Sequence, residues 1–328
     1  MAGFRLARRS SRKDNDCKDM NPKVTVIIST YNRPKELNSV CLASVRDQTF
    51  KDFECIIIDD ASKTEYAIHK PCLDTKIIWN KVNTGKSACI NQAVKLARGE
   101  YIVVVDDDNC LAPQFLELTV KAIEEESAKE MKWSNSEWHA VTTGRIVVHK
   151  GYKDYAPAYY QQGLGFAAID WGWLIRKKVF DVIQYDETLF GDEDADFGIQ
   201  FYKNYRAYAL DLPLQTAFAD RNDGVCLPTE KRLGSLERFI VKNKEEYEES
   251  GPKDLSFLYR FAGRNFYLAG YKRKAIGYFW KCFKAWPNRR TLTHFLTSLI
   301  SYKAYYGLMR LEEKYYSRKR LKAYKLNI

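Results

Sequence analysis

The strongest constraint on the fold is a regular alternation of apolar and amphipathic segments between residues 24 and 126. Four near-continuous apolar segments predict buried β-strands, at 24–29, 53–60, 76–80 and 101–108. Three segments with apolar residues at helical spacing predict helices, at 34–48, 85–99 and 113–126. Buried strands that alternate with helices favour a mostly parallel sheet with helices on both faces. The sequence therefore predicts an α/β fold of Rossmann-like type.

The pattern changes twice further along the chain. Residues 138–149 and 208–212 have the pattern of strands, whereas 163–180 is rich in glycine and tryptophan and predicts strand and loop around a pocket. Residues 186–205 predict a loop that leads into a helix. From about residue 230 the spacing is helical throughout, which predicts an all-helical C-terminal extension. Its last segment carries an apolar stripe made of Leu292, Phe295, Leu296, Leu299, Ile300 and Tyr306.

The charge distribution marks the same boundary. Residues 230–328 carry 23 Lys and Arg against 9 Asp and Glu, a net charge of +14, whereas residues 24–229 carry 23 against 30. We therefore predict a disordered basic arm at 1–22, an α/β domain at 23–229 and a basic helical region at 230–328. A basic, tyrosine-rich region is able to bind an anionic membrane surface or a nucleic acid, and it is equally compatible with a solvated charged face.

Two further features bear on the compartment. No run of 18 apolar residues is present to predict a transmembrane helix, and the N-terminal segment has no apolar core of signal-peptide length. The eight cysteines are scattered without a C-x-x-C pair, which is typical of reduced cysteines. We therefore predict a cytoplasmic protein.

Polar residues gather where three of the predicted strands end. These residues are Thr30, Tyr31 and Asn32, then Asp59 and Asp60, then Asp106, Asp107 and Asp108. In open α/β sheets, ligands bind beyond the carboxyl ends of the strands. Three adjacent carboxylates repel one another unless a cation lies between them, and Mg²⁺ or Mn²⁺ prefers such oxygen ligands. The alternative is a polar turn that caps the following helix.

A second acidic group stands at 191–198, in the sequence GDEDADFG. Asp192, Glu193 and Asp194 precede or begin a predicted helix, where carboxylates are favoured by the exposed N–H groups and the helix dipole. Capping accounts for one or two of them. A further carboxylate beside an acidic cleft has a raised pKa and is able to act as a general base.

Taken in order, these segments resemble the family 2 glycosyltransferases of GT-A fold over about residues 23–205. The likeness comprises the S-T-Y-N-R strand end, the Q-T-F-x-D-F-E approach to I-I-D-D-A-S, and the N-x-G-x-x-x-x-x-N-x-A helix. It continues through G-E-Y-I, the D-x-D sequence and the E-D-x-D helix. The order and spacing of the motifs carry the resemblance, because each motif alone is common.

The resemblance implies a donor site. Its nucleotide pocket would be lined by Ser29, Thr30 and Tyr31, and Asp60 would bind the base, expected to be uracil. Lys86 would contact the phosphate or the base, although a lysine at a helix start is often only solvated. The D-x-D sequence would be formed by Asp106, Asp107 and Asp108. Asp108 and Asp106 would bind the metal, and Asp107 would meet the ribose or the metal.

The resemblance also implies an acceptor side. Asp194 would be the catalytic base. Glu193, Trp171 and Trp173 would face the acceptor, with the alternative that the tryptophans are large core residues.

The implied function is that of an inverting glycosyltransferase. It would move a sugar from a nucleotide-diphosphate donor, expected to be a UDP-sugar, with Mn²⁺ or Mg²⁺, to a hydroxyl of a glycan or lipid-linked acceptor. The pathway would be cell-surface polysaccharide or glycoconjugate biosynthesis. The basic helices would hold the protein peripherally on the inner face of a membrane.

Three alternatives remain from the sequence. A catalytically inactive binding or scaffold subunit of a polysaccharide-assembly complex would keep the fold without the chemistry. Nucleic-acid binding rests only on the basic end, without a recognisable module, and is not expected. A glycoside hydrolase is a weaker option, since it pairs two carboxylates across a glycosidic bond.

Overall fold

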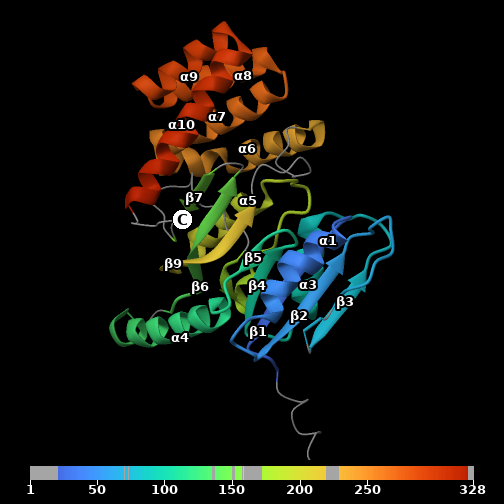
Figure 1. The fold of residues 1–328 in the computed structure, drawn as a ribbon. Helices are drawn as coiled ribbons and strands as arrows, with labels where there is room; N and C mark the ends of the chain where they lie inside the picture. Colours follow the sequence, from blue (N-terminus) through green and yellow to red (C-terminus); the bar gives the residue numbers. More distant parts are fainter. Residues whose placement is uncertain are drawn as a thin grey trace, which may run out of the picture.

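The computed structural model of the 328-residue chain describes most of it. The described residues are 21–69, 71–72, 74–134, 137–149, 152–156, 158, 172–218 and 229–323. Within them the architecture is a single mixed sheet covered by helices, followed by a run of helices (Figure 1).

The first half of the sheet is parallel, as predicted. Its strands are β1 (Val24–Thr30), β2 (Phe53–Asp59), β3 (Thr75–Trp79) and β4 (Tyr101–Asp106), in the order β3-β2-β1-β4. Ile27 of β1 faces one apolar layer, whereas its neighbours Val26 and Ile28 face the other. Both faces of these strands are therefore buried, which explains why their sequences are apolar without interruption.

The second half of the sheet is mixed. It contains β8 (Leu174–Arg176), which is antiparallel to β4, and then β6 (Ala140–His149), β9 (Ala207–Phe218) and β5 (Cys110–Leu111), with β7 (Tyr152–Ala156) paired to β6. The prediction of a mostly parallel sheet therefore holds for the first four strands but not for this half. β9 also continues beyond the predicted end at residue 212, because a register shift opposite Gly144 accommodates Pro213, which has no N–H to donate.

Helices cover both faces of the sheet. One face carries α4 (Phe115–Ser134) and the segment 34–46, which forms α1 (Pro34–Glu36), the π-helical turn η1 (Leu37–Cys41) and α2 (Leu42–Arg46) instead of one regular helix. The other face carries α3 (Lys86–Leu96), the 3₁₀ helix η3 (Lys177–Asp181) and α5 (Glu193–Asn204).

The C-terminal region is helical, as predicted, and packs directly on the sheet domain. It consists of α6 (Glu230–Ser250), α7 (Pro252–Leu268), α8 (Lys272–Ala285), α9 (Arg289–Ile300) and α10 (Tyr302–Ala323). Its apolar core also contains Leu189 and Ile199, which come from the segment before α5 and from α5 itself. Figure 1 shows these helices, in orange and red, on the side of the sheet that carries α5 and β7. In the part of the chain that the structure describes, no helix is both long and apolar enough to cross a bilayer.

A close backbone contact gives a test of the sheet domain. A Cβ on Gly99 would lie 2.5 Å from the backbone nitrogen of Thr25 and 2.7 Å from the carbonyl carbon of Val24. Because these are backbone atoms of β1, Gly99→Ala should lower the free energy of unfolding by about 1–3 kcal/mol, measured by urea denaturation. Gly277→Ala is the matched control, since nothing lies within 4 Å of its Cβ position in α8. It should raise the stability by about 0.5–1 kcal/mol through helix propensity. Equal effects of the two substitutions would contradict the contact.

Candidate active site

The strand ends named in the sequence meet at one edge of the sheet. Ser29 of β1 lies beside Asp106 of β4, and Thr30 lies beside Asp59 of β2. The backbone N–H of Asp60 donates to the carbonyl of Thr30 over 2.9 Å, which ties the ends of β1 and β2 together. The predicted gathering of polar groups at the carboxyl edge is therefore confirmed.

Two cations relieve the repulsion among the three adjacent aspartates. Lys86 Nζ lies 2.6 Å from Asp106 Oδ1. Arg33 Nη1 donates to Asp107 Oδ1 over 3.2 Å and to Asp108 Oδ2 over 3.0 Å. Arg33 was not among the predicted site residues, although it is the last residue of the S-T-Y-N-R motif and is a cation next to a predicted acidic edge.

Asp107 is the most deeply buried of the three. Its side chain is 7% exposed, and its Oδ2 accepts a 2.7 Å hydrogen bond from the Thr30 hydroxyl. Burial raises the pKa of Asp107 to about 6, with a further contribution from Asp108 and Asp106, against the opposing effects of Arg33 and Thr30. The carboxyl edge therefore contains one carboxyl group, that of Asp107, whose pKa is raised by burial.

Asp60 organises the loop that leads into α3. Its carboxylate accepts from the backbone N–H groups of Thr84 and Gly85, both over 2.8 Å, and from the Asn80 amide over 3.3 Å. Burial raises the pKa of Asp60, but these hydrogen bonds outweigh it and lower the pKa below its ordinary value. Gly85 has φ +92°, a conformation that L-residues rarely adopt, so the loop needs glycine there to present Lys86 as the first residue of α3.

The start of α5 faces the same edge. Burial lowers the pKa of Lys86, but the negative charges of Asp106, Glu193 and Asp194 outweigh it and hold that pKa well above its usual range. The charge of Lys86 is therefore stabilised by carboxylates at the end of β4 and at the start of α5. Glu193 Oε2 accepts from the backbone N–H of Gly191 over 2.5 Å, which ties the first residue of α5 to the segment that precedes it. Asp194 Oδ1 accepts from the Ala195 N–H over 2.7 Å.

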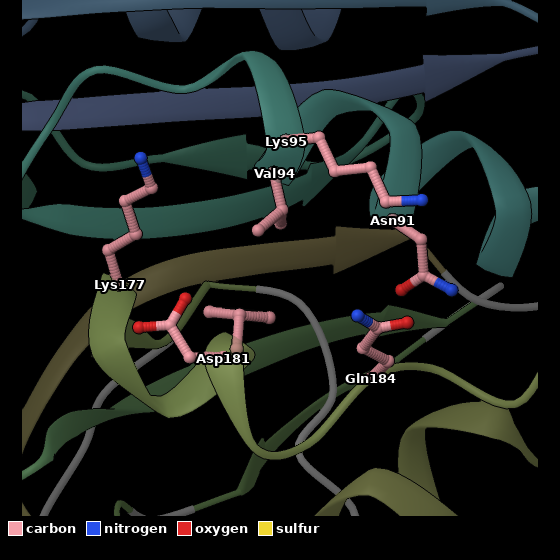
Figure 2. Close-up of a pocket in the computed structure, with 7 residues that line it drawn as sticks. Asn91, Val94, Lys95, Lys177, Asp181 and Gln184 are labelled. Atoms are coloured by element: carbon pink, nitrogen blue, oxygen red, sulfur yellow. The ribbon is translucent and has the colours of Figure 1, made fainter.

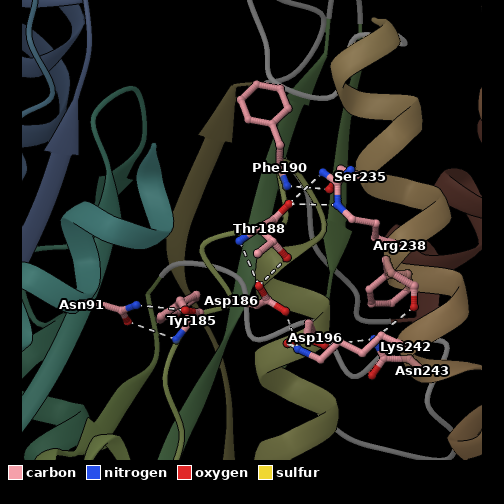
Figure 3. Close-up of polar contacts among 11 residues, drawn as sticks. Asn91, Tyr185, Asp186, Thr188, Phe190, Asp196, Ser235, Arg238, Lys242 and Asn243 are labelled. Atoms are coloured by element: carbon pink, nitrogen blue, oxygen red, sulfur yellow. Dashed lines mark hydrogen bonds and ion pairs between the residues drawn. The ribbon is translucent and has the colours of Figure 1, made fainter. Parts of the chain in front are cut away.

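Contacts from α6 fix the segment that leads into α5. The Arg232 guanidinium donates to both carboxylate oxygens of Asp192, and both side chains are almost fully buried. Ser235 Oγ accepts from the Phe190 N–H over 2.6 Å, and Lys242 Nζ bonds to Asp186 and Asp196 over 2.6 and 2.9 Å. Figure 3 shows the contacts of Ser235, Arg238, Lys242 and Asn243 on one side of this segment.

The opposite side of the segment rests on α3. The Asn91 amide donates to the Tyr185 carbonyl over 2.9 Å and accepts from the Tyr185 N–H over 3.1 Å (Figure 3). The carboxylates at the start of α5 are therefore held between α3 and α6. The predictions from sequence did not include this arrangement, because Arg232 and Asp192 are 40 residues apart.

One of the two tryptophans expected on the acceptor side, Trp173, is buried. Trp173 is 7% exposed and packs edge-to-face on Phe201 and Tyr202, with ring centroids 6.1 and 5.9 Å apart. It is a core residue, so the core alternative is correct for it. Trp171 lies outside the described residues.

A separate cavity of about 410 Å³ lies between α3 and η3 (Figure 2). It is lined by Asn91, Val94, Lys95, Lys177, Phe180, Asp181 and Gln184. Lys177 follows Arg176, which pairs with Tyr101 at the first residue of β4. The cavity therefore lies toward the amino ends of the strands, away from Asp106.

The carboxylates at this edge supply too few ligands to hold a hard divalent cation by themselves, so a substrate would have to supply the others. Among residues 21–323, within the described ranges, no three His, Cys, Asp or Glu side chains converge on one point. Asp106 and Asp108 still offer carboxylate oxygens, with side chains 26% and 15% exposed. Mg²⁺ and Mn²⁺ are commonly held by one or two carboxylates together with phosphate oxygens, which agrees with this set.

Comparison with known proteins gives one family and several distant relatives. The family model described as glycosyl transferase family 2 matches residues 25–183. A glycosyltransferase of Methanocaldococcus jannaschii, uncharacterised by name, is 23% identical over 296 residues, which cover 87% of this chain and 86% of the relative. WcaA of Escherichia coli, named for colanic acid biosynthesis, is 23% identical over 249 residues, which cover 71% and 85%.

Solved structures show the same fold. Residues 1–349 of TarS from S. aureus align with a TM-score of 0.57 at 19% identity, covering 82% of each chain. The mannosyltransferase PcManGT from Pyrobaculum calidifontis aligns with a TM-score of 0.55 at 16% identity, covering 90% of this chain and 85% of its own. The predicted GT-A fold is therefore confirmed.

The raised pKa of Asp107 predicts a dependence of stability on pH. In the unfolded chain this carboxyl titrates near 3.8, whereas in the folded protein it titrates near 6, so between these values the folded state binds the proton more tightly. The contribution of Asp107 to stability should therefore fall by about 2 kcal/mol as the pH rises from about 4 to about 7. The measurement is the unfolding free energy of the wild type minus that of Asp107→Asn at both pH values in EDTA. A difference that is constant with pH, or that grows as the pH rises, would contradict the raised pKa.

Proposed function

Because residues 25–183 belong to glycosyl transferase family 2, we propose that this protein transfers a sugar from a nucleotide-diphosphate donor to an acceptor hydroxyl with inversion at the anomeric carbon. The observation that carries the proposal is Lys86, which pairs with Asp106 at the carboxyl end of β4 and whose pKa is also raised by the negative charges of Glu193 and Asp194 at the start of α5. In the proposed reaction the leaving diphosphate lies beside the cation at the end of β4. The attacking hydroxyl lies beside the carboxylates that begin α5, on the other side of the sugar.

We propose that the donor lies along the ends of β1, β2 and β4. Tyr31 is 41% exposed at the end of β1 and offers a ring to stack on the base beside Ser29, Thr30 and Asp60. Lys86 and Arg33 are cations at the place where the diphosphate would lie. A solved structure of TarS is a complex with UDP-GlcNAc and one of PcManGT is a complex with GDP-Man and Mn²⁺, so a UDP-sugar is our first choice and a GDP-sugar the second.

The proposed chemistry is a single displacement. Asp194 takes the proton of the acceptor hydroxyl, whose oxygen forms the new bond to the anomeric carbon while the bond from that carbon to the diphosphate oxygen breaks. The electron pair leaves with the diphosphate, and Lys86 and Arg33 stabilise its charge. A divalent cation held by Asp106 and Asp108 would supply further charge neutralisation of the leaving group. Glu193, buried beside Asp194, would position the acceptor side of the site.

The acceptor class follows from relatives rather than from geometry. WcaA is named for colanic acid biosynthesis. We propose that the acceptor is a glycan or lipid-linked glycan of a cell-surface polysaccharide. The catalytic unit would extend over residues 23–229, with residues 230–328 supporting it.

Replacing Asp194 with asparagine tests the base. The variant should lose roughly 10²–10⁴-fold in transfer rate, because the hydroxyl keeps its proton, while its affinity for the nucleotide stays within a factor of about two. Nucleotide release measures turnover, and calorimetry measures affinity. Asp181→Asn, in the cavity between α3 and η3, is the matched control and should leave the turnover and the nucleotide affinity unchanged. Full turnover by Asp194→Asn would remove Asp194 as the base.

Replacing Asp108 with alanine tests the cation. Calorimetric titration with UDP, GDP, dTDP and CMP, each in Mn²⁺ and in EDTA, should show metal-dependent binding of one nucleotide diphosphate to the wild type. Asp108→Ala should weaken that binding by roughly tenfold or more in Mn²⁺ and leave binding in EDTA unchanged. If the wild type binds no nucleotide under either condition, the enzymatic proposal fails and a scaffold function takes its place.

A further inference from the structure

Helix α9 presents its apolar side to solvent and its polar side to the protein. The residues of α9 that face the interior are Thr291, His294 and Ser298, all at most 4% exposed. On the opposite side, Leu292, Leu296, Leu299 and Ile300 are 39%, 47%, 46% and 71% exposed. A surface helix in water normally has the reverse arrangement. The orientation of α9 therefore needs an explanation outside the described chain.

The interior contacts fix this orientation. His294 Nε2 lies 3.2 Å from Glu312 Oε2, and the Tyr267 hydroxyl donates to the Ser298 carbonyl over 3.2 Å. Thr291 takes part in a capping box with Asn288 at the start of the helix. Rotating α9 to bury its leucines would break these contacts. These contacts therefore hold the apolar face of α9 toward solvent.

Aromatic rings extend the exposed face onto α8. Trp280 is 42% exposed and contacts Phe295 of α9, with ring centroids 5.2 Å apart. Trp286, between the two helices, is 43% exposed. Tryptophan and tyrosine are typical of surfaces that lie at the level of lipid headgroups.

The segment of the chain that carries this face is basic. Residues 255–311 contain 11 Lys and Arg and no Asp or Glu. Lys284 Nζ lies 5.1 Å from the ring centroid of Trp280, and Lys272 Nζ lies 3.4 Å from the carbonyl oxygen of Leu299. Arg289 is exposed on the same side of α9 as Leu292 and Leu296. Cations therefore border the apolar side chains at both ends of the helix.

We propose that this face, made of Leu292, Leu296, Leu299, Ile300 and Trp280 with Lys272, Lys284 and Arg289 at its border, docks on the surface of an anionic lipid bilayer. Leucine and isoleucine side chains gain free energy by entering the headgroup region, and each flanking cation is attracted to anionic lipid. Figure 1 shows α8 and α9 at the end of the molecule far from β2 and β3, so a flat surface is able to approach them. The inference deepens the proposed function, on which it rests for a lipid-linked acceptor.

Other occupants fit the face less well. A second copy related by a twofold axis would bring two cationic faces together. Residues 1–20 carry six Lys and Arg against three Asp, so they are repelled by the same charge. Nucleic acid would satisfy the cations but would leave the leucines in water.

The test is vesicle flotation of the full chain without nucleotide. The protein should float with phosphatidylcholine vesicles that contain roughly one quarter phosphatidylglycerol, and not with phosphatidylcholine alone. Binding should weaken when NaCl rises from about 50 mM to about 500 mM. The double variant Leu296→Gln/Ile300→Gln should bind roughly tenfold or more weakly, because it removes the apolar contact and keeps every charge.

The matched control is Val241→Gln on α6, where an apolar side chain is 81% exposed outside this face. It should float as the wild type does. Failure of the wild type to float, or equal floating of the double variant, would overturn the docking. A dimer of the wild type in sedimentation that the double variant lacks would identify a second copy as the occupant. Binding of the wild type and the double variant alike to single-stranded DNA, without floating on vesicles, would identify nucleic acid. Nucleotide binding by the wild type and the double variant, measured separately, shows whether the donor site is intact, so the two proposals fail independently.

Discussion

Three adjacent carboxylates at the end of a buried strand are the feature on which the rest of the site depends. Asp106, Asp107 and Asp108 stay together because Lys86 and Arg33 bring positive charge to them from two other elements. Each cation is itself fixed by the fold, Lys86 by the glycine turn that begins α3 and Arg33 by its place at the start of α1. The pKa of Asp107 nevertheless remains raised, chiefly because its carboxyl group is buried.

The position of Asp194 depends on a contact between the start of α5 and α6. Asp194 stands in the first turn of α5, and that turn begins with Asp192, whose carboxylate is locked by Arg232. A buried ion pair of this kind adds little net stability, but loss of one partner leaves an unpaired charge in the interior. The pair therefore acts mainly to select one orientation for the start of α5. α6 has this effect although the family match ends at residue 183, before either residue.

The sequence predicted those features that depend on local pattern. The four parallel strands and their acidic ends followed from apolar runs and the residues behind them. Arg33 escaped notice because its partners lie 74 and 75 residues away, and pattern does not report which cation meets which carboxylate. The last strand was predicted to end at residue 212, before Pro213. In the structure it continues, because the register shift between β6 and β9 accommodates a proline there. The predicted apolar stripe lies on α9 except for Tyr306, which belongs to α10. Periodicity does not specify whether a stripe faces inward, and here polar contacts inside the protein decide it.

The apolar core shared by α5 and α6 also limits how the chain can be divided. Leu189 and Ile199 are buried against Leu233, Leu236 and Phe239, so removing everything after residue 229 would expose the back of α5 to water. The composition break near that residue is therefore not a seam between independent folding units. The two regions are expected to unfold together, because α5, which would carry the reacting carboxylate, buries its apolar side only when α6 packs on it. A substitution that destabilises α6 is therefore expected to destabilise α5 as well.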